Sequence, residues 1–430
     1  MDAATYRDYA NILHEELVPA MGCTEPIAIA YAAAVARQTL GRPAQRMEVE
    51  ASGNIIKNVK SVFVPNTGGL RGIPAAAAAG MAAGDPALEL EVLSSIGEGE
   101  QAAIRQYLAD TPIAVKLADS PFIFDIAIRA WAEEDSALVR IVNYHTNIVR
   151  VERNGQVLKE VEAQAAAEEG LTDKSVLTVE GILEFAREAA LADVEEAVGR
   201  QVRYNTAIAQ EGLRGDYGAN IGKVLLATYG DDVKIRAKAM AAAGSDARMN
   251  GCGLPVVIVS GSGNQGLTAS LPVVEYAKEL GADWETTLRA VLVSDLITIH
   301  LKAEIGRLSA YCGAVSAGCG SGAGIAWLYG REKEPQALLK DVSHTIVNAL
   351  AVDSGIVCDG AKASCAAKIA SAVDAGLLGF YMYQNGQQFR GGDGIISKGV
   401  EQTIRNIGLL ATQGMRETDR EILDIMTTRC

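Results

Sequence analysis

Strand-like alternation of apolar and polar residues stops near residue 162, and this change limits the fold more than any other feature. Before it, several stretches alternate apolar and polar residues, as half-buried strands do. These stretches are residues 46–57, 59–66, 87–96, 113–118, 122–132, 137–145 and 147–161. Helical spacing occurs among them over residues 4–18, 25–39, 75–83 and 98–109. We therefore predict an N-terminal mixed α/β domain with a partly antiparallel sheet over residues 1–165.

The rest of the chain is almost wholly helical in pattern and rich in Ala and Gly. A polar segment, residues 162–175, separates the two parts and is the expected domain boundary. Small residues let helices approach closely, so we predict a mostly all-α domain with tight crossings over residues 175–430. The fold class is then α+β. The clearest helices are expected over residues 178–191, 193–210, 231–243, 267–280, 284–303 and 336–351.

The net charge and the length of the apolar runs limit the kinds of partner that the protein is expected to bind. The net charge of -14 argues against a nucleic acid or an anionic membrane as partner. No apolar run reaches membrane-spanning length without charged residues, and the N-terminus has no signal-peptide pattern. We expect a cytoplasmic protein that acts on a small molecule. The Ala- and Gly-rich helices would also suit a subunit interface, so a homodimer stays open.

Four of the seven cysteines lie in two Gly- and Ala-rich segments. Cys312 and Cys319 belong to "CGAVSAGCG", and Cys358 and Cys365 enclose "CDGAKASC". Converging thiolates bind either zinc or an iron–sulfur cluster. Seven residues of continuous helix would hold two sulfurs about 10 Å apart, so one end of each pair must lie on a loop. The alternative is four independent core thiols.

Cys23 lies in "MGCTEP", directly before a predicted helix. The free N–H groups and the positive dipole end of a helix start favour a thiolate over a thiol. Cys23 is therefore a candidate reactive thiol. The alternative is a small buried hydrophobic residue.

A Gly- and Ser-rich loop, "VSGSGNQGLTAS" (residues 259–270), follows a strand-like segment and precedes a helix. Its backbone N–H groups and polar side chains would form a pocket for a carboxylate or a phosphate. The loop lacks the Lys-Ser/Thr ending of a P-loop and the spacing of a dinucleotide fingerprint. The alternative is a tight interhelical turn. The candidate residues are Ser262, Gly263, Asn264, Gln265 and Gly266.

The first domain offers further polar residues where strands are expected to end. Asn54 follows one such strand, and His145, Thr146 and Asn147 lie at the bend between two others. A histidine in this place is a candidate acid/base group, or a structural hydrogen bonder.

Taken together, "GCTEP", "GSGNQG", "CGAVSAGCG" and "CDGAKASC" resemble the L-cysteine desulfidase family, a group of serine-dehydratase-like proteins. The resemblance runs in order from about residue 10 to about residue 415. The helical domain is more distantly similar to the alpha part of iron–sulfur L-serine dehydratases. The resemblance implies a lyase with a 4Fe-4S cluster that converts L-cysteine to pyruvate, ammonia and hydrogen sulfide.

The resemblance also assigns roles to residues. It implies that Cys312, Cys358 and Cys365 hold the cluster, with one iron open to substrate, and that Cys23 is the remaining active-site thiol. Cys23 is then a base for the substrate's α-proton, with His145 as a second acid/base candidate. The loop over residues 262–266, with Asn54 or Thr146 and Asn147 across a cleft, would hold the carboxylate and the amine. Apart from the resemblance, the last residue, Cys430, is a candidate cap for the open iron.

Three other functions fit parts of the pattern. One is an L-serine dehydratase with the same cluster, because leaving-group chemistry alone does not separate hydroxide from hydrosulfide. Another is a pyridoxal-phosphate lyase with "GSGNQG" as its phosphate cup. The third is a non-catalytic thiol or metal sensor.

Overall fold

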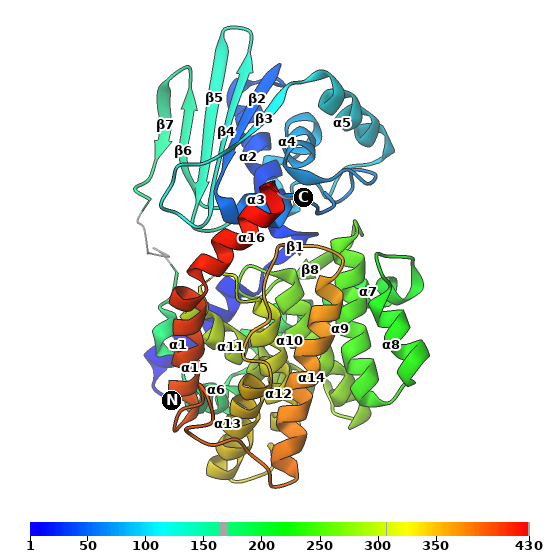
Figure 1. The fold of residues 1–430 in the computed structure, drawn as a ribbon, viewed down its shortest axis with the longest axis vertical. Helices are drawn as coiled ribbons and strands as arrows, with labels where there is room; N and C mark the ends of the chain where they lie inside the picture. The colour runs from blue at the N-terminus through cyan, green and yellow to red at the C-terminus, as the bar shows by residue number, and fades with distance from the viewer. Residues whose placement is uncertain (164–170, 307, 429–430) are drawn as a thin grey trace.

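Five of the seven predicted strand stretches of the first part form a six-stranded mixed sheet in the computed structural model, which describes residues 1–163, 171–306 and 308–428 (Figure 1). The strand order is β3-β2-β4-β5-β6-β7, in which only the β2–β3 pair is parallel. This arrangement confirms the α+β fold class. The strands are β2 (Arg46–Ala51), β3 (Ile113–Leu117), β4 (Asp125–Ala132), β5 (Asp135–Val142), β6 (Ile148–Arg153) and β7 (Gln156–Glu160).

A buried helix, α2 (Thr24–Leu40), packs against the middle of this sheet. Alternate residues of β2, namely Met47, Val49 and Ala51, are buried, which is the strand period that the sequence predicts. The helix α4 (Gly72–Ala83) lies on α2, and α5 (Glu98–Asp110) lies on α4. A Cβ at Gly80 would lie 1.9 Å from the carbonyl oxygen of Ala30, so α2 and α4 touch backbone to backbone.

Two predicted strands are wrong, and a third is shorter than predicted. Residues 87–96 contain a 3₁₀ helix, Pro86–Glu91, because Pro86 fixes its first turn and the Asp85 carboxylate accepts from the N–H of Ala87. Residues 59–66 form turns with one isolated bridge, and the sheet strand predicted over 46–57 ends at Ala51. Helix α3 (Gly53–Val59) follows, in which Ile55 and Val59 are buried one turn apart.

The second part of the chain is a helical lobe, as predicted. Its central helix is α12 (Gly313–Gly330), which packs against α10, α11, α13 and α14. The other helices are α6 (Val179–Glu188), α7 (Leu191–Arg214), α8 (Ile221–Tyr229), α9 (Val233–Met249), α10 (Gly263–Glu279), α11 (Trp284–Ile305), α13 (Pro335–Val352), α14 (Cys365–Gln384), α15 (Val400–Leu409) and α16 (Arg416–Thr428).

Glycine allows a close helix crossing in this lobe, between α12 and α14. A Cβ at Gly376 would lie 2.1 Å from the carbonyl oxygen of Gly318, and a Cβ at Gly318 would lie 2.2 Å from that of Ala372. The prediction of tight crossings through small residues is confirmed here. Helix α14 is long and apolar enough to cross a membrane, but 56% of its most apolar window is buried inside the protein. Packing in the helical core accounts for its composition.

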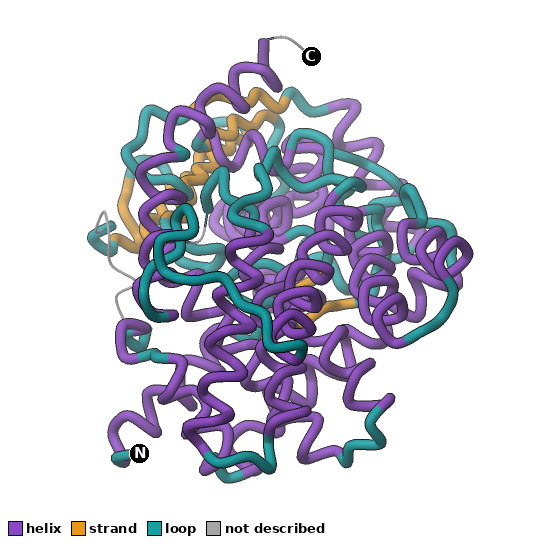
Figure 2. The backbone as a smooth tube through the Cα atoms, turned by 60° about the horizontal axis from the view of Figure 1, so that its bottom comes forward, coloured by secondary structure: helices purple, strands orange, loops and turns teal. Residues whose placement is uncertain are grey.

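The two lobes are connected at a short strand pair and at α16 (Figure 1). The strand β1 (Pro19–Met21) pairs antiparallel with β8 (Pro255–Val257) where the lobes meet. Figure 2 shows this short pair among the helices, apart from the main sheet. Helix α1 (Ala3–Glu16) packs on α7 in the helical lobe, whereas α16 crosses to α3 of the sheet lobe. The domain boundary between residues 165 and 175 stays a prediction, because residues 164–170 lie outside the described part.

Candidate active site

A small buried cavity of about 110 Å³ lies at the junction of the lobes. The β1–β8 pair positions it, because Cys23 follows β1 and the Gly- and Ser-rich loop follows β8. The predicted site residues that line the cavity are Cys23, Asn54, His145, Ser262, Asn264, Gln265, Cys312, Cys358 and Cys365. Residues that were predicted from segments far apart in the sequence therefore meet at one place. We call this space the inner cavity.

The three thiols Cys312, Cys358 and Cys365 reach the inner cavity from three short segments. The N–H of Cys312 donates to Ile356 O at 2.9 Å, and the N–H of Cys358 donates to Ala310 O at 2.7 Å. This bridge places Cys312, at the start of α12, beside Cys358 on a loop. Cys365 begins α14, and its thiol donates to the carbonyl oxygen of Gly360 at 3.7 Å. Each thiol thus lies at a helix start or on a loop, as the spacing argument requires.

The surroundings of these thiols are rich in cations. A hydrogen bond from Cys312 lowers the pKa of the Cys358 thiol to about 6, and the charges of Lys57 and Lys362 lower it too. The same hydrogen bond, together with burial, raises the pKa of Cys312. Lys362 and Lys368 both pair with Asp359 beside the loop. Positive charge at this place would stabilise thiolates or an anionic group bound to them.

Cys319 has a different environment. It lies inside α12, is 1% exposed, and donates to the carbonyl oxygen of Ile346 at 3.7 Å. It does not line the inner cavity. Cys430 lies outside the described residues.

The donor set fits an iron–sulfur cluster. Three sulfurs face one cavity, and an iron–sulfur cluster takes cysteine thiolates as its ligands, each on a separate iron. A single ion instead requires donors that converge on one point. Within residues 1–163, 171–306 and 308–428, no three His, Cys, Asp or Glu side chains converge in that way.

Cys23, which also lines the inner cavity, forms a pair with a buried carboxylate. Its thiol donates to Glu25 Oε2 at 3.0 Å, and Asn58 Nδ2 donates to Glu25 Oε1 at 2.9 Å. The hydroxyl of Thr24 bonds to the same carboxylate and to the carbonyl oxygen of Gly261 on the loop after β8. These bonds hold the start of α2 against both lobes.

The charge state of Cys23 differs from the one that the sequence predicts. Burial, and then the negative charge of Glu25, raise the pKa of Cys23 well above its ordinary value. The prediction that the helix start lowers this pKa is therefore wrong. Burial alone would raise the pKa of Glu25, but the charge of His145, the hydrogen bond from Cys23 and Arg248 lower it overall. The resting pair is a thiol that donates to a carboxylate.

The loop after β8 presents buried polar atoms to the inner cavity. Asn264 Oδ1, Gln265 Oε1 and Arg248 Nε are buried and have no hydrogen-bond partner within the described part of the chain. Such atoms cost free energy unless something binds them. A polar ligand is the simplest partner for them.

Two glycines of the loop have a packing role instead. A Cβ at Gly266 would lie 2.0 Å from Val257 O, and a Cβ at Gly263 would lie 2.4 Å from Arg248 Nε. They let the start of α10 approach β8 and Arg248, and neither lines the inner cavity.

His145 lines the inner cavity and is 7% exposed, with its ring 4.8 Å from that of Phe124. The structure does not bring Thr146 and Asn147 to the inner cavity. Asn147 instead bonds through Nδ2 to Val142 O at 2.9 Å, because it closes the turn between β5 and β6. Of the candidates for the amine, only Asn54 lines the cavity.

The sequence interpretation missed some lining residues, among them Glu25 and Arg248. Glu25 carries the clearest signal, a carboxylate in the first turn of an otherwise apolar helix. Arg248 gives a weaker one, at the end of the Ala-rich helix α9.

The fold and the cavity define an α+β protein with a buried, thiol-lined site between a sheet lobe and a helical lobe. The family model described as serine dehydratase alpha chain matches residues 87–424. A protein of Desulfitobacterium hafniense named UPF0597 is 58% identical over 425 residues, which cover 99% of this chain and 97% of the relative. A UPF0597 protein of Lachnoclostridium phytofermentans is 51% identical over 98% of this chain and 99% of its own. The chain belongs to the serine dehydratase alpha chain family and is similar over its whole length to UPF0597 proteins.

Proposed function

We propose that this protein is an iron–sulfur lyase that eliminates the β-substituent of a small L-amino acid, with L-cysteine as substrate. The observation that carries the proposal is the inner cavity itself. It joins three thiols, a thiol–carboxylate pair and unpartnered polar atoms in a volume of about 110 Å³. These are the groups that elimination needs: a site for a Lewis acid, a proton acceptor and a carboxylate pocket.

Binding depends on the residues around the loop after β8. The substrate carboxylate would bind to Arg248 and to the start of α10, where the helix N-terminus and the guanidinium both favour an anion. Asn54 Oδ1, which is buried and without a partner among the described residues, would accept from the amine. Both contacts orient the Cα–H bond toward Cys23.

Proton removal would then involve Cys23 and Glu25. The proton of the Cys23 thiol moves to Glu25 along their 3.0 Å hydrogen bond, and the thiolate so formed takes the α-proton. The C–H electron pair forms the Cα=Cβ bond, and the β-substituent leaves with its own bonding pair. Aminoacrylate results, which water converts to pyruvate and ammonia.

Cys312, Cys358 and Cys365 would hold a 4Fe-4S cluster at the other end of the cavity. The cluster, when bound, supplies an open iron as a Lewis acid for the leaving sulfur. Lys57 and Lys362 would balance its negative charge.

Serine is the competing substrate, because the matching family is described by serine dehydratase. The test is a product assay on anaerobically reconstituted protein, with L-cysteine and L-serine in parallel. The proposal expects equal amounts of sulfide and pyruvate from L-cysteine and a much higher kcat/KM than with L-serine. Pyruvate from L-serine alone would assign the dehydratase activity. Activity that requires added pyridoxal phosphate would contradict both.

A further inference from the structure

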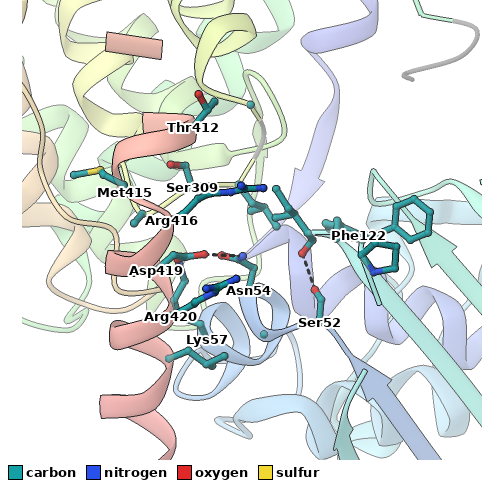
Figure 3. Close-up of a pocket in the computed structure, with 18 of the residues that line it drawn as sticks. Ser52, Asn54, Lys57, Phe122, Ser309, Thr412, Met415, Arg416, Asp419 and Arg420 are labelled. Atoms are coloured by element: carbon teal, nitrogen blue, oxygen red, sulfur yellow. Dashed lines mark hydrogen bonds and ion pairs between the residues drawn. The ribbon is translucent and has the colours of Figure 1, made fainter. Parts of the chain in front are cut away.

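A second cavity of about 750 Å³ lies beside the inner cavity, with α16 as one of its walls (Figure 3). We call it the outer cavity. Its other walls are α3, the loop before β4 and the segment before α12. Asp419 of α16 accepts from Asn54 Nδ2 at 2.8 Å and pairs with Lys57, which holds α16 in this place.

The two cavities share a wall. Asn54, Phe124, Leu308 and Ser309 line both of them. The inner cavity is lined by deeply buried groups, such as Cys23 at 2% exposed. A substrate needs a route to these groups, and the larger outer cavity adjoins them directly.

The outer cavity has a surplus of positive charge. Among the residues that the structure describes, three cations line it, Lys57, Arg416 and Arg420, against one carboxylate, Asp419. Lys57 pairs with Asp419, and Arg420 pairs with Glu417 at 2.7 Å. Arg416 forms no ion pair within the part of the chain that the structure describes. Figure 3 shows its side chain extending from α16 into the cavity, toward the side of Ser309.

These groups match the two charged ends of an amino acid. A guanidinium binds a carboxylate with two parallel hydrogen bonds. On the shared wall, Asn54 Oδ1 is the acceptor that the amine would reach in the inner cavity. The outer cavity therefore offers a donor for the carboxylate, and the shared wall carries the acceptor for the amine.

We propose that the outer cavity is a loading site for the substrate, in which Arg416 binds the carboxylate of a small α-amino acid before the molecule passes the shared wall. The proposal rests on the proposed function, because it assumes that the inner cavity turns over an amino acid. Arg416 acts here in binding and takes no part in the chemistry.

The test is Arg416→Ala in full-length, reconstituted protein with L-cysteine. We expect KM to rise about tenfold, equivalent to about 1.4 kcal/mol of binding free energy, with kcat and iron content within twofold of wild type. Arg416→Lys should recover part of the loss. Arg405→Ala is the matched control, because Arg405 lies on α15, bonds to Gln402 and lines neither cavity.

A second pair of variants tests the route itself. Thr412 lines the outer cavity and its neighbour Gln413 does not. Thr412→Trp should lower kcat/KM at least fivefold, and Gln413→Trp should not. An unchanged KM in Arg416→Ala would overturn the loading site. A change confined to kcat at saturating L-cysteine would also overturn it and would assign a separate effector site.

Direct binding separates this proposal from the proposed function. Calorimetric titration of L-cysteine into protein without a cluster should show weaker binding for Arg416→Ala than for wild type. A wild type without lyase activity overturns the proposed function. Equal affinities in the titration overturn the loading site whether or not the enzyme is active.

Discussion

At the scale of single residues, the pair of Cys23 and Glu25 determines how the site can work. A buried thiol beside a carboxylate has a raised pKa, so it keeps its proton until the carboxylate accepts it. The role of Glu25 follows from three hydrogen bonds, two from the neighbouring residues Cys23 and Thr24 and one from Asn58 on another helix.

Glu25→Gln keeps the shape of the side chain and removes its charge. We expect kcat to fall at least about 100-fold, because the proton acceptor of Cys23 is lost, while iron content stays at the wild-type level. A kcat within threefold of wild type would exclude Glu25 from proton transfer.

The same substitution should move the titration of Cys23. Since the charge of Glu25 helps to raise the pKa of Cys23, its removal should shift alkylation of Cys23 by iodoacetamide to lower pH. Mass spectrometry of the labelled peptide measures the shift. Cys252, which lies outside the inner cavity, serves as the internal control and should keep its profile.

The candidate site could be predicted from the sequence where chemistry depends on residue type and local motif. Cys312, Cys358 and Cys365, which the family resemblance implies, and the polar residues of the loop after β8 all line the inner cavity. Arg248 could not be found in this way, because only the folded chain brings it to Glu25 and the loop. The pKa of Cys23 was missed for the same reason, since burial outweighs the helix start.

At the scale of elements, long helices with a clear period agree with the prediction, whereas two of the short alternating segments do not. Residues 87–96 alternate like a strand but form a 3₁₀ helix, because Asp85 and Pro86 impose a turn. One sequence shows a period of two without showing whether a partner strand is available.

The crossing of α12 and α14 predicts the effect of one methyl group. Gly376→Ala would place a Cβ 2.1 Å from Gly318 O, so we expect about 1–3 kcal/mol of lost stability. Gly99→Ala on α5, where a Cβ would meet nothing within 4 Å, should leave stability unchanged or add up to about 1 kcal/mol. Urea unfolding of the two variants measures the difference. Equal stabilities would contradict the tight crossing.

A buried carboxylate on α9 predicts a pH dependence of stability. Asp246 is 1% exposed, accepts from the N–H of Gly222 at 3.1 Å, and has its pKa raised by burial to about 6. The pKa of this carboxyl in the unfolded chain is near 4, so between about pH 4 and pH 6 the folded protein binds more protons than the unfolded chain. Its contribution to stability is therefore complete below about pH 4 and is lost as the pH rises through 6.

Asp246→Asn should remove this dependence while keeping an acceptor for Gly222. We expect the variant to be more stable than wild type by about 2–3 kcal/mol above pH 7, and similar to wild type near pH 4. Thermal unfolding at the two pH values tests this. A variant that is less stable than wild type at both pH values would show that another group stabilises the charge of Asp246 in the folded protein.

At the scale of the whole molecule, the site exists because two lobes meet. The β1–β8 pair joins them on one side and α16 on the other, and the inner cavity lies between these connections. The cytoplasmic location and the homodimer stay predictions, as does the absence of nucleic-acid and membrane partners.

The role of α16 as a connection can be measured directly. Asp419→Ala removes the partner of Lys57 and Asn54, so we expect hydrogen exchange of residues 416–428 to become faster, with α15 unchanged. Glu417→Ala, which breaks only an exposed pair with Arg420, is the control. Equal exchange in both variants would show that Asp419 does not hold α16.

The central claim is that three of the described cysteines hold a cluster in the inner cavity. Its most direct measurement is iron and acid-labile sulfide per chain after anaerobic reconstitution of wild type, Cys358→Ala and Cys319→Ala. The account predicts about four irons for wild type and for Cys319→Ala, and a large loss for Cys358→Ala alone. Equal iron in all three proteins, or none in wild type, would contradict it.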